Sequence, residues 1–205
     1  MILMSEHAPT SKAVRDRLQR PLRDLRISVT DRCNFRCVYC MPREIFGPGY
    51  AFLPRKDLLT LEEIARVANV FAALGMRKVR ITGGEPLIRR NLEHLIEMIG
   101  ATEGVQDISL TTNGSMLTAD RAVSLRQAGL KRLTISLDAL DDATFKSIND
   151  VDYPASRVLD GIDNARAAGF SDIKVNAVVR RGLNEHAVLD LAKHFRHSGC
   201  IVRFI

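Results

Sequence analysis

Short segments rich in apolar and β-branched residues recur along the chain, and amphipathic segments fill the intervals between them. The apolar segments have the length of strands and are bounded by turn-forming or charged residues, which predicts buried strands at 25–30, 78–82, 107–111, 132–137, 172–179 and 200–205. Apolar residues at helical spacing predict helices at 60–74, 91–99, 118–128, 155–168 and 184–197. The first helix has the clearest boundaries, because Thr60 and Glu63 form a capping-box pattern and Gly75 follows the last turn.

The regular alternation of these segments predicts the fold class. Strand–helix alternation with apolar strands is typical of an α/β fold, in which helices cover a parallel sheet. Six strands are too few for a complete eight-stranded barrel, so we expect a partial (β/α)6 TIM-like barrel. We assign this domain to residues 22–205 and interpret residues 1–21 as a basic N-terminal leader.

Unusual residues gather at the ends of the predicted strands. Polar or glycine-rich segments follow the first four strands, at 30–33, 83–86, 111–114 and 136–138, and the fifth strand carries Lys174 and Asn176. The carboxyl ends of parallel strands lie on one side of the domain, where α/β enzymes have their sites. Five consecutive units therefore direct polar groups toward one cavity.

Three of the four cysteines, Cys33, Cys37 and Cys40, lie within eight residues in the first of these segments. Such close spacing indicates metal chemistry more than a disulfide framework. A 4Fe-4S cluster usually takes four cysteine ligands, so three would leave one iron open to a substrate or cosubstrate. The alternative, a zinc site, needs a fourth ligand. Cys200 cannot supply it, because it begins the last strand, at the opposite end of the sheet.

Two further features indicate ligand binding. Gly83 and Gly84 can adopt a positive φ and let a ligand approach the backbone closely, and Glu85 offers an acceptor for a cationic amine; the alternative interpretation is a simple turn. Arg80 and Lys174 lie inside apolar strands, where a charge is costly unless it is paired or faces a cavity. Each is therefore either half of a buried ion pair with an acidic residue or part of a clamp for an anion.

Composition narrows the class of partner. Hydrophobic residues at 46% and charged residues at 26% are ordinary globular values, which excludes a disordered chain. The net charge of +6 suits an anionic partner, and the low aromatic content of 5% favours a small phosphorylated molecule over nucleic acid. No apolar run approaches the length of a membrane span, and the start lacks the apolar core of a secretory signal, so we expect a cytoplasmic protein without membrane contact.

The motifs together resemble a known family. The segment LRISVTDRCNFRCVYCMP (25–42) resembles the cluster motif of radical S-adenosylmethionine (SAM) enzymes. With RITGGEPLIRR (80–90), LTTNG (110–114), TISLDAL (134–140) and KVNAVV (174–179), the chain is similar to the GTP 3′,8-cyclase family of molybdenum-cofactor biosynthesis. The resemblance covers residues 22–205, with every motif in family order.

The resemblance implies a function and a set of site residues. It implies a radical SAM lyase that converts GTP to (8S)-3′,8-cyclo-7,8-dihydroguanosine 5′-triphosphate, with a 4Fe-4S cluster and SAM as cofactors and an electron donor as partner. A homodimer is compatible with the sequence, which does not itself reveal the oligomeric state. In the family a second three-cysteine cluster follows the last strand, and this chain ends at Ile205, so we expect it to be the SAM-binding part with an incomplete base site. The alternatives are a radical SAM enzyme with another substrate and a non-catalytic iron–sulfur fragment. Carried over to this chain, the cluster ligands are Cys33, Cys37 and Cys40, the SAM contacts are Tyr39, Gly84 and Ser136, and the GTP contacts are Arg26, Arg80, Thr111 and Lys174.

Overall fold

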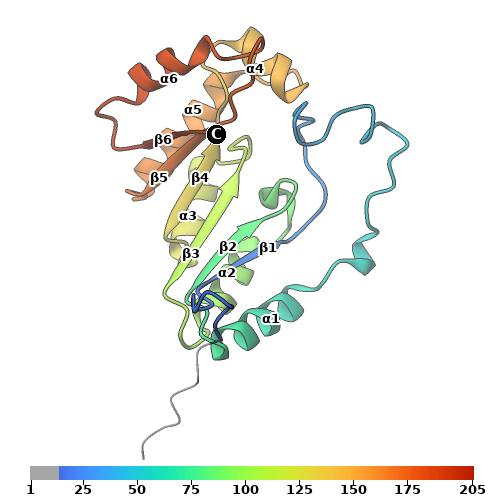
Figure 1. Cartoon of the computed structure of the whole chain (residues 1–205), viewed down its shortest axis with the longest axis vertical. Helices are drawn as coiled ribbons and strands as arrows, with labels where there is room; N and C mark the ends of the chain where they lie inside the picture. Colours follow the sequence, from blue (N-terminus) through green and yellow to red (C-terminus); the bar gives the residue numbers. More distant parts are fainter. Residues whose placement is uncertain (1–13) are drawn as a thin grey trace, which may run out of the picture.

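The computed structural model describes residues 14–205, and within them strands and helices alternate (Figure 1). The strands are β1 (Asp24–Ser28), β2 (Lys78–Thr82), β3 (Asp107–Thr112), β4 (Arg132–Ser136), β5 (Ile173–Ala177) and β6 (Ile201–Phe204). The helices are α1 (Leu61–Ala73), α2 (Leu92–Gly100), α3 (Ala119–Gln127), α4 (Asp142–Asn149), α5 (Ala155–Ala167) and α6 (Ala187–Phe195), with short 3-10 helices η1 (Arg55–Asp57) and η2 (Pro86–Ile88). All six predicted strands are confirmed, and β2 has the predicted bounds.

The strands form one parallel sheet in the order β1-β2-β3-β4-β5-β6. Each strand pairs with its neighbours in the sequence, and at least one helix lies on every connection. Right-handed crossovers of this kind curl a parallel sheet toward a barrel. The predicted α/β class and partial (β/α)6 barrel are confirmed.

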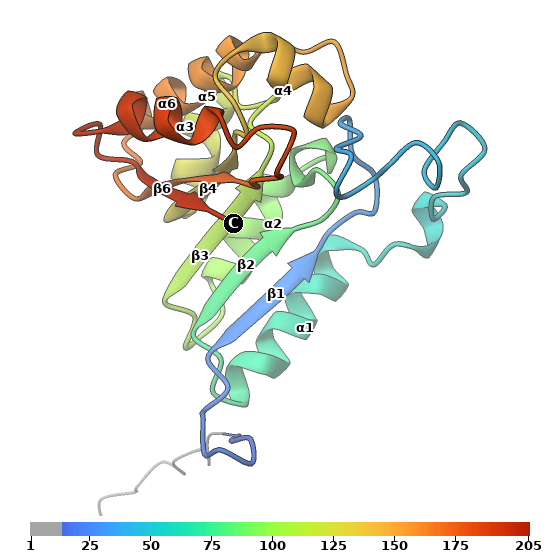
Figure 2. The ribbon, with the colours of Figure 1, turned by 45° about the horizontal axis from the view of Figure 1, so that its top comes forward.

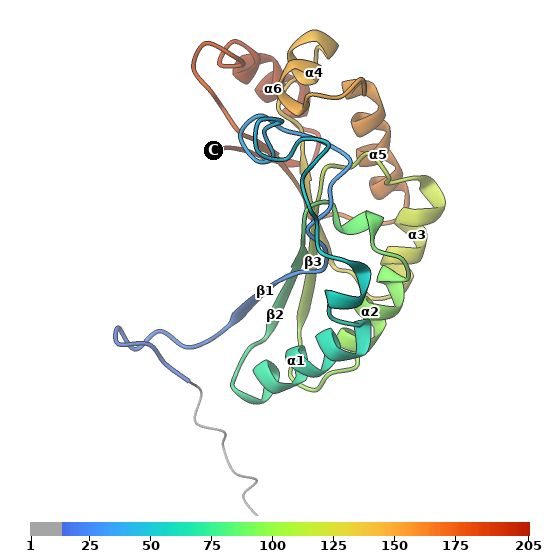
Figure 3. The same ribbon diagram turned by 90° about the vertical axis from the view of Figure 1, so that its right-hand side faces the viewer.

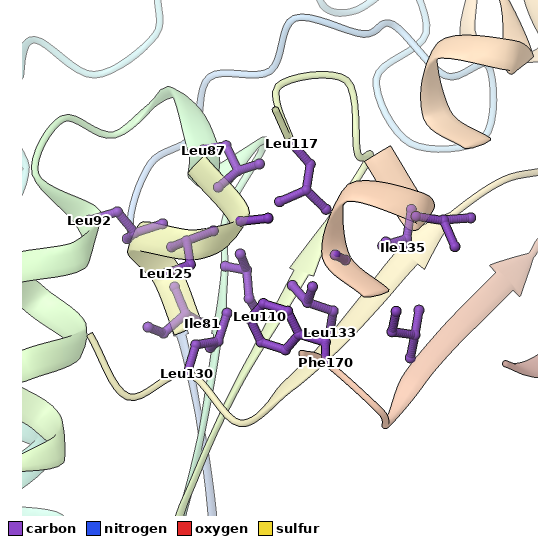
Figure 4. Packing of buried hydrophobic residues seen from close by; sticks show 14 of the residues in the cluster. Ile81, Leu87, Leu92, Leu110, Leu117, Leu125, Leu130, Leu133, Ile135 and Phe170 are labelled. Atoms are coloured by element: carbon purple, nitrogen blue, oxygen red, sulfur yellow. The ribbon is translucent and has the colours of Figure 1, made fainter. Parts of the chain in front are cut away.

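One face of the sheet carries the hydrophobic core. Figure 3 shows α1, α2, α3 and α5 on the same side of the strands. Alternate strand residues point toward these helices, and Ile81, Leu110, Leu133 and Ile135 are fully buried there. Figure 4 shows them packed against helix and loop residues that include Leu125. Burial of these side chains is the main force that holds the helices on the sheet.

The opposite face of the sheet is polar. Because successive residues of a strand point to opposite faces, register partners share a face. Arg26 pairs in register with Arg80, and Thr134 pairs with Lys174, so these four side chains lie on the face opposite to the core. The expectation of six buried strands therefore needs correction, since helices cover one face only. The alternation was hidden in the sequence because the polar positions include Thr and Ser, which also occur in buried strands.

Helix boundaries follow local signals where these are strong. The Thr60 side chain accepts a hydrogen bond from the Glu63 backbone N–H and the Glu63 side chain accepts one from the Thr60 N–H, which confirms the capping box of α1. Helix α4 was not predicted. It has eight residues, and Asp141 caps it by accepting from the Thr144 N–H. Helices this short give too little periodicity for a reliable sequence prediction.

The predicted N-terminal leader is described only in part, because residues 1–13 lie outside the described residues. Residues 14–22 fold back on themselves through an antiparallel bridge between Arg15 and Pro21. The Val14 N–H donates to the Leu74 carbonyl, which joins this segment to the end of α1. The domain boundary at residue 22 stays a prediction. Within residues 14–205, no helix has both the length and the apolar character needed to cross a membrane.

Candidate functional site

A cavity of about 150 Å³ lies at the carboxyl ends of the strands. Its walls come from the ends of β2, β3 and β4, from the cysteine segment after β1 (residues 33–40) and from α4. The expectation that the strand ends direct polar groups toward one cavity is confirmed for β2, β3 and β4. The residues that line the cavity include Cys33, Cys37, Cys40, Tyr39, Gly84, Glu85, Thr111, Thr112, Asn113, Ser136, Asp138, Phe145 and Asn149.

The cysteine segment is held in place mainly by backbone hydrogen bonds. Figure 2 shows the connection from β1 to α1 extending past the ends of the strands. The Gly84 N–H donates to the Thr30 carbonyl at 2.7 Å, and the Glu85 N–H donates to the Arg32 carbonyl at 2.8 Å. On the other side, two N–H groups of the segment donate to the carbonyls of Ile148 and Asn149. The cysteines are therefore fixed between the end of β2 and the end of α4.

The glycine pair serves this packing. A Cβ atom on Gly84 would lie 2.2 Å from the Arg32 carbonyl oxygen, and one on Gly83 would lie 2.7 Å from the Thr30 carbonyl oxygen. Neither glycine has a positive φ. The predicted use of conformational freedom is therefore wrong. The glycines are required because the backbone of the cysteine segment passes too close for any side chain.

Burial controls the protonation of the thiols. Cys33 and Cys37 are half-buried and Cys40 is exposed. Burial, with a contribution from the Asp138 carboxylate, raises the pKa of Cys37 to about 12. Burial also raises the pKa of Cys33, although the Phe35 N–H donates to its sulfur at 3.4 Å. At neutral pH both thiols are protonated in the metal-free chain, so binding a metal must release protons.

The three thiols are candidate ligands of a metal centre. Cys33, Cys37 and Cys40 all line the same cavity. In a 4Fe-4S cluster each thiolate binds a different iron, so three thiols at one cavity fit a cluster, whereas a zinc site needs a fourth ligand.

Asp138 links the cysteine segment to the sheet. The Tyr39 hydroxyl donates to Asp138 Oδ2 at 2.8 Å, and the Val178 N–H donates to Asp138 Oδ1 at 2.8 Å. Burial raises the pKa of this carboxyl group, while the two donors lower it. The family resemblance predicts Tyr39 at the site, but the sequence gives no partner for its hydroxyl. The pairing joins the cysteine segment to the ends of β4 and β5.

Glu85 has a similar structural role between β2 and β3. Its carboxylate accepts from the Thr112 hydroxyl at 2.6 Å, from the Asn113 N–H at 2.7 Å and from the Leu87 N–H at 3.0 Å. Burial raises the pKa of Glu85. Because three internal donors already occupy the carboxylate, the structure does not support the prediction that it accepts a ligand amine.

The predicted GTP contacts divide into two groups. Thr111 lines the cavity, whereas Arg26, Arg80 and Lys174 lie on the open face outside its walls. None of these three cations has a carboxylate partner within residues 14–205, whereas Arg132 on the same face pairs with Asp107. Neither Arg80 nor Lys174 takes part in an ion pair within residues 14–205, so the alternative of a buried ion pair at these positions is wrong.

One further cation on this face was missed. Arg203 pairs in register with Asn176, so it shares the open face with Lys174. The sequence contains part of this information. Arg203 lies two residues after Ile201, and Lys174 and Asn176 are also two residues apart, so each pair shares one face of its strand. The register was needed to place it on the same face.

The fold and the site define a class of protein before any comparison: a parallel partial barrel that holds a cysteine-bound cofactor at the carboxyl ends of its strands. The family described as the radical SAM superfamily matches residues 27–195, and the chain belongs to this superfamily. Its members take SAM and a 4Fe-4S cluster as cofactors, and the three cysteines that line the cavity fit the cluster.

Individual relatives give a narrower likeness. The chain is 57% identical over 195 residues to a GTP 3′,8-cyclase from Acidothermus cellulolyticus, and 50% identical over 194 residues to one from Staphylococcus epidermidis. These alignments cover 95% of this chain but only 54% and 56% of the relatives, so the chain spans about half their length.

Solved structures share the fold at low sequence identity. Streptococcus suis SuiB bound to SAM has a TM-score of 0.68 at 18% identity, covering 89% of this chain and 40% of SuiB. HydG, a maturase of the [FeFe]-hydrogenase, has a TM-score of 0.68 at 15% identity, covering 89% of this chain and 43% of HydG.

Proposed function

We propose that this chain is the SAM-cleaving part of a GTP 3′,8-cyclase, in which the cavity holds the cluster and SAM and the open face holds the triphosphate of GTP. The proposal rests on the identity to the cyclases and on one structural observation. Arg26, Arg80 and Lys174, which have no carboxylate partner in the described part of the chain, share the open face that leads to the cysteine cavity.

The cavity residues have distinct parts in this proposal. Cys33, Cys37 and Cys40 would hold the cluster, and three cysteine ligands would leave one of its irons available to SAM. When bound, these two cofactors supply the one-electron chemistry that starts the reaction, with a low-potential electron donor as partner. The chain contributes position. Tyr39, Gly84 and Ser136 line the cavity where SAM would lie.

The open face suits a long polyanion. Arg26 and Arg80 lie on neighbouring strands. Lys174 lies on β5, which is three strand spacings from β2, or about 14 Å across the sheet. Arginine and lysine side chains are long enough to reach toward one another from these positions. Charge-assisted hydrogen bonds to phosphate contribute about 1.5–3 kcal/mol each. In the proposed site Arg203 adds a fourth cation, and Thr111 lies between the phosphates and the cavity.

An equilibrium titration of GTP tests the proposal. Arg80→Ala and Lys174→Ala should each weaken GTP binding by roughly tenfold to a hundredfold. Arg66 on α1 and Lys193 on α6 are exposed and lie on the helix side of the sheet, so Arg66→Ala and Lys193→Ala are matched controls that should leave affinity unchanged. Because the triphosphate is common to GTP and ATP, the two nucleotides should bind with similar, weak affinity.

Two outcomes would contradict the proposal. Tight, guanine-selective binding that neither Arg80→Ala nor Lys174→Ala affects would show that the triphosphate site lies elsewhere. A radical SAM enzyme with another substrate is indicated if the reconstituted chain binds SAM but no nucleoside triphosphate. A cytoplasmic location and a homodimer stay predictions from the sequence.

A further inference from the structure

Asn149 combines deep burial with polar atoms that have no partner. It is the last residue of α4, and only 2% of its surface is exposed. Its side-chain Nδ2 and Oδ1 atoms are both buried, and neither forms a hydrogen bond within residues 14–205. The same residue lines the cavity together with Cys33 and Cys37.

The fold fixes Asn149 in this position. The Arg36 N–H donates to the Asn149 carbonyl and the Val38 N–H donates to the Ile148 carbonyl, both at 2.9 Å. One turn earlier on the same helix, Phe145 packs edge-on against Phe35 of the cysteine segment, with 6.3 Å between ring centroids. The backbone and the aromatic pair therefore place the end of α4 against the cysteines without any use of the Asn149 amide.

A second buried asparagine shows what a structural role looks like in this chain. Asn184 is 1% exposed. Its Nδ2 donates to the carbonyls of Asp138 and Val178, both at 2.9 Å, and its Oδ1 accepts from the Arg180 N–H at 2.8 Å. Buried amides are nearly always satisfied in this way, because an unpaired one loses its hydrogen bonds to water without replacement. Asn149 differs from Asn184 in this respect.

We propose that Asn149 is a SAM-binding residue whose amide forms hydrogen bonds to a polar end of SAM bound in the cavity. The chemistry of the amide selects this ligand over the cluster. An amide offers one acceptor and a donor group, and both are unpaired here. A cluster sulfide or a thiolate only accepts, so it would leave Oδ1 unpaired. The amino acid end and the ribose hydroxyls of SAM carry donors and acceptors together and can satisfy both atoms.

Three other polar side chains of the wall are already engaged where they meet the cysteine segment or the sheet. Thr112 donates to Glu85, Asn113 donates to Asn34, and Asp138 accepts from Tyr39. Asn149 lines this cavity with a fixed backbone, and its side-chain amide has no hydrogen-bond partner within residues 14–205. The inference rests on the proposed SAM site and adds a residue on α4 to it.

The test compares Asn149→Leu with Asn184→Leu in the full chain. The affinity of the reconstituted protein for SAM is measured by anaerobic equilibrium dialysis, and thermal unfolding is measured on the metal-free protein. Asn149→Leu should weaken SAM binding about tenfold while the iron content stays at the wild-type level. Its metal-free melting temperature should equal or exceed that of the wild type, because the substitution removes an unpaired buried amide. Asn184→Leu should lower that temperature.

Three results would overturn the inference. The first is SAM affinity unchanged in Asn149→Leu. The second is a fall in its metal-free melting temperature as large as that of Asn184→Leu, which would give the side chain a structural role. If the leucine does not fit, Asn149→Ala decides by the same two measurements. The third is an iron-loaded wild type that binds no SAM, which would remove the proposed SAM site itself, whereas SAM binding unaffected by the variants refutes only the role of Asn149.

Discussion

The two faces of the sheet are built from alternate residues of the same strands, yet they differ in composition, burial and consequence. In β4, Leu133 and Ile135 are fully buried against helices, whereas Thr134 and Ser136 are only half-buried on the open face. The helix-covered face consists almost wholly of aliphatic side chains. The open face carries charged groups, hydroxyls and an amide, and its cations Arg26, Arg80, Lys174 and Arg203 have no carboxylate partner within residues 14–205.

This difference separates stability from function in space. Aliphatic side chains on the covered face lose water contact on folding, which stabilises the domain. A charge on that face would need a partner, but on the open face Arg80 keeps its contact with solvent at little cost. The cysteine segment lies at the rim where the two faces end. Substitutions on the covered face should therefore affect stability, and those at the rim should affect cofactor binding.

The largest effect should come from the rim. Cys37→Ser should abolish the cluster, reducing the iron content of anaerobically reconstituted protein from about four atoms per chain to nearly none. Cys200→Ser is the matched control, because Cys200 precedes β6 at the amino end of the sheet and should leave the iron content unchanged. Iron and sulfide analysis measures both. About eight irons in the wild type, or loss of iron in Cys200→Ser, would refute the single-cluster assignment.

Next in size is the contrast within β4. Leu133→Ala removes a fully buried side chain from the covered face and should lower the free energy of unfolding by about 2–5 kcal/mol. Thr134→Ala, one residue further on the open face, should change it by about 0.5 kcal/mol or less. Denaturant titration of the metal-free proteins measures both values. Equal destabilisation by the two substitutions would contradict the assignment of the faces.

A smaller effect is expected where the cysteine segment packs on β2. Gly84→Ala places a methyl group against the Arg32 carbonyl and should cost about 1–3 kcal/mol of stability, with a lower yield of cluster. Gly49→Ala introduces the same methyl group where no atom lies within 4 Å, so it should be close to neutral. Unfolding curves measure the stability of the two variants, and the absorbance of the reconstituted proteins measures their cluster content. A neutral Gly84→Ala would mean that the segment is not fixed by this contact.

Much of the fold could be predicted because its signals are local. Apolar runs placed all six strands, and the capping box at Thr60 placed the start of α1. Helix α4 was missed because eight residues give a weak periodic signal, and its N-cap Asp141 is one of several acidic residues in that stretch. The two faces of the sheet were not separated, because their separation depends on the register of neighbouring strands.

The site was only partly predictable for a related reason. The three cysteines and the glycine pair could be selected from the sequence, but the close approach of the cysteine segment to the glycines could not. The use of the Glu85 carboxylate could not be foreseen, since its donors come from β3 and from η2. Asn149 gave no signal at all. Its unpaired amide is a consequence of α4, the cysteine segment and the strand ends meeting in space.

The formation of 5′-deoxyadenosine by the reconstituted chain tests the central claim most directly, because it requires the cysteines, the cavity and SAM to act together. With SAM and a strong one-electron reductant under anaerobic conditions, the wild-type chain should form 5′-deoxyadenosine slowly but well above the Cys37→Ser background. The predicted result is turnover that depends on the cysteine triad and persists in Cys200→Ser. A chain that carries about four irons and yet forms no 5′-deoxyadenosine above that background would contradict the account.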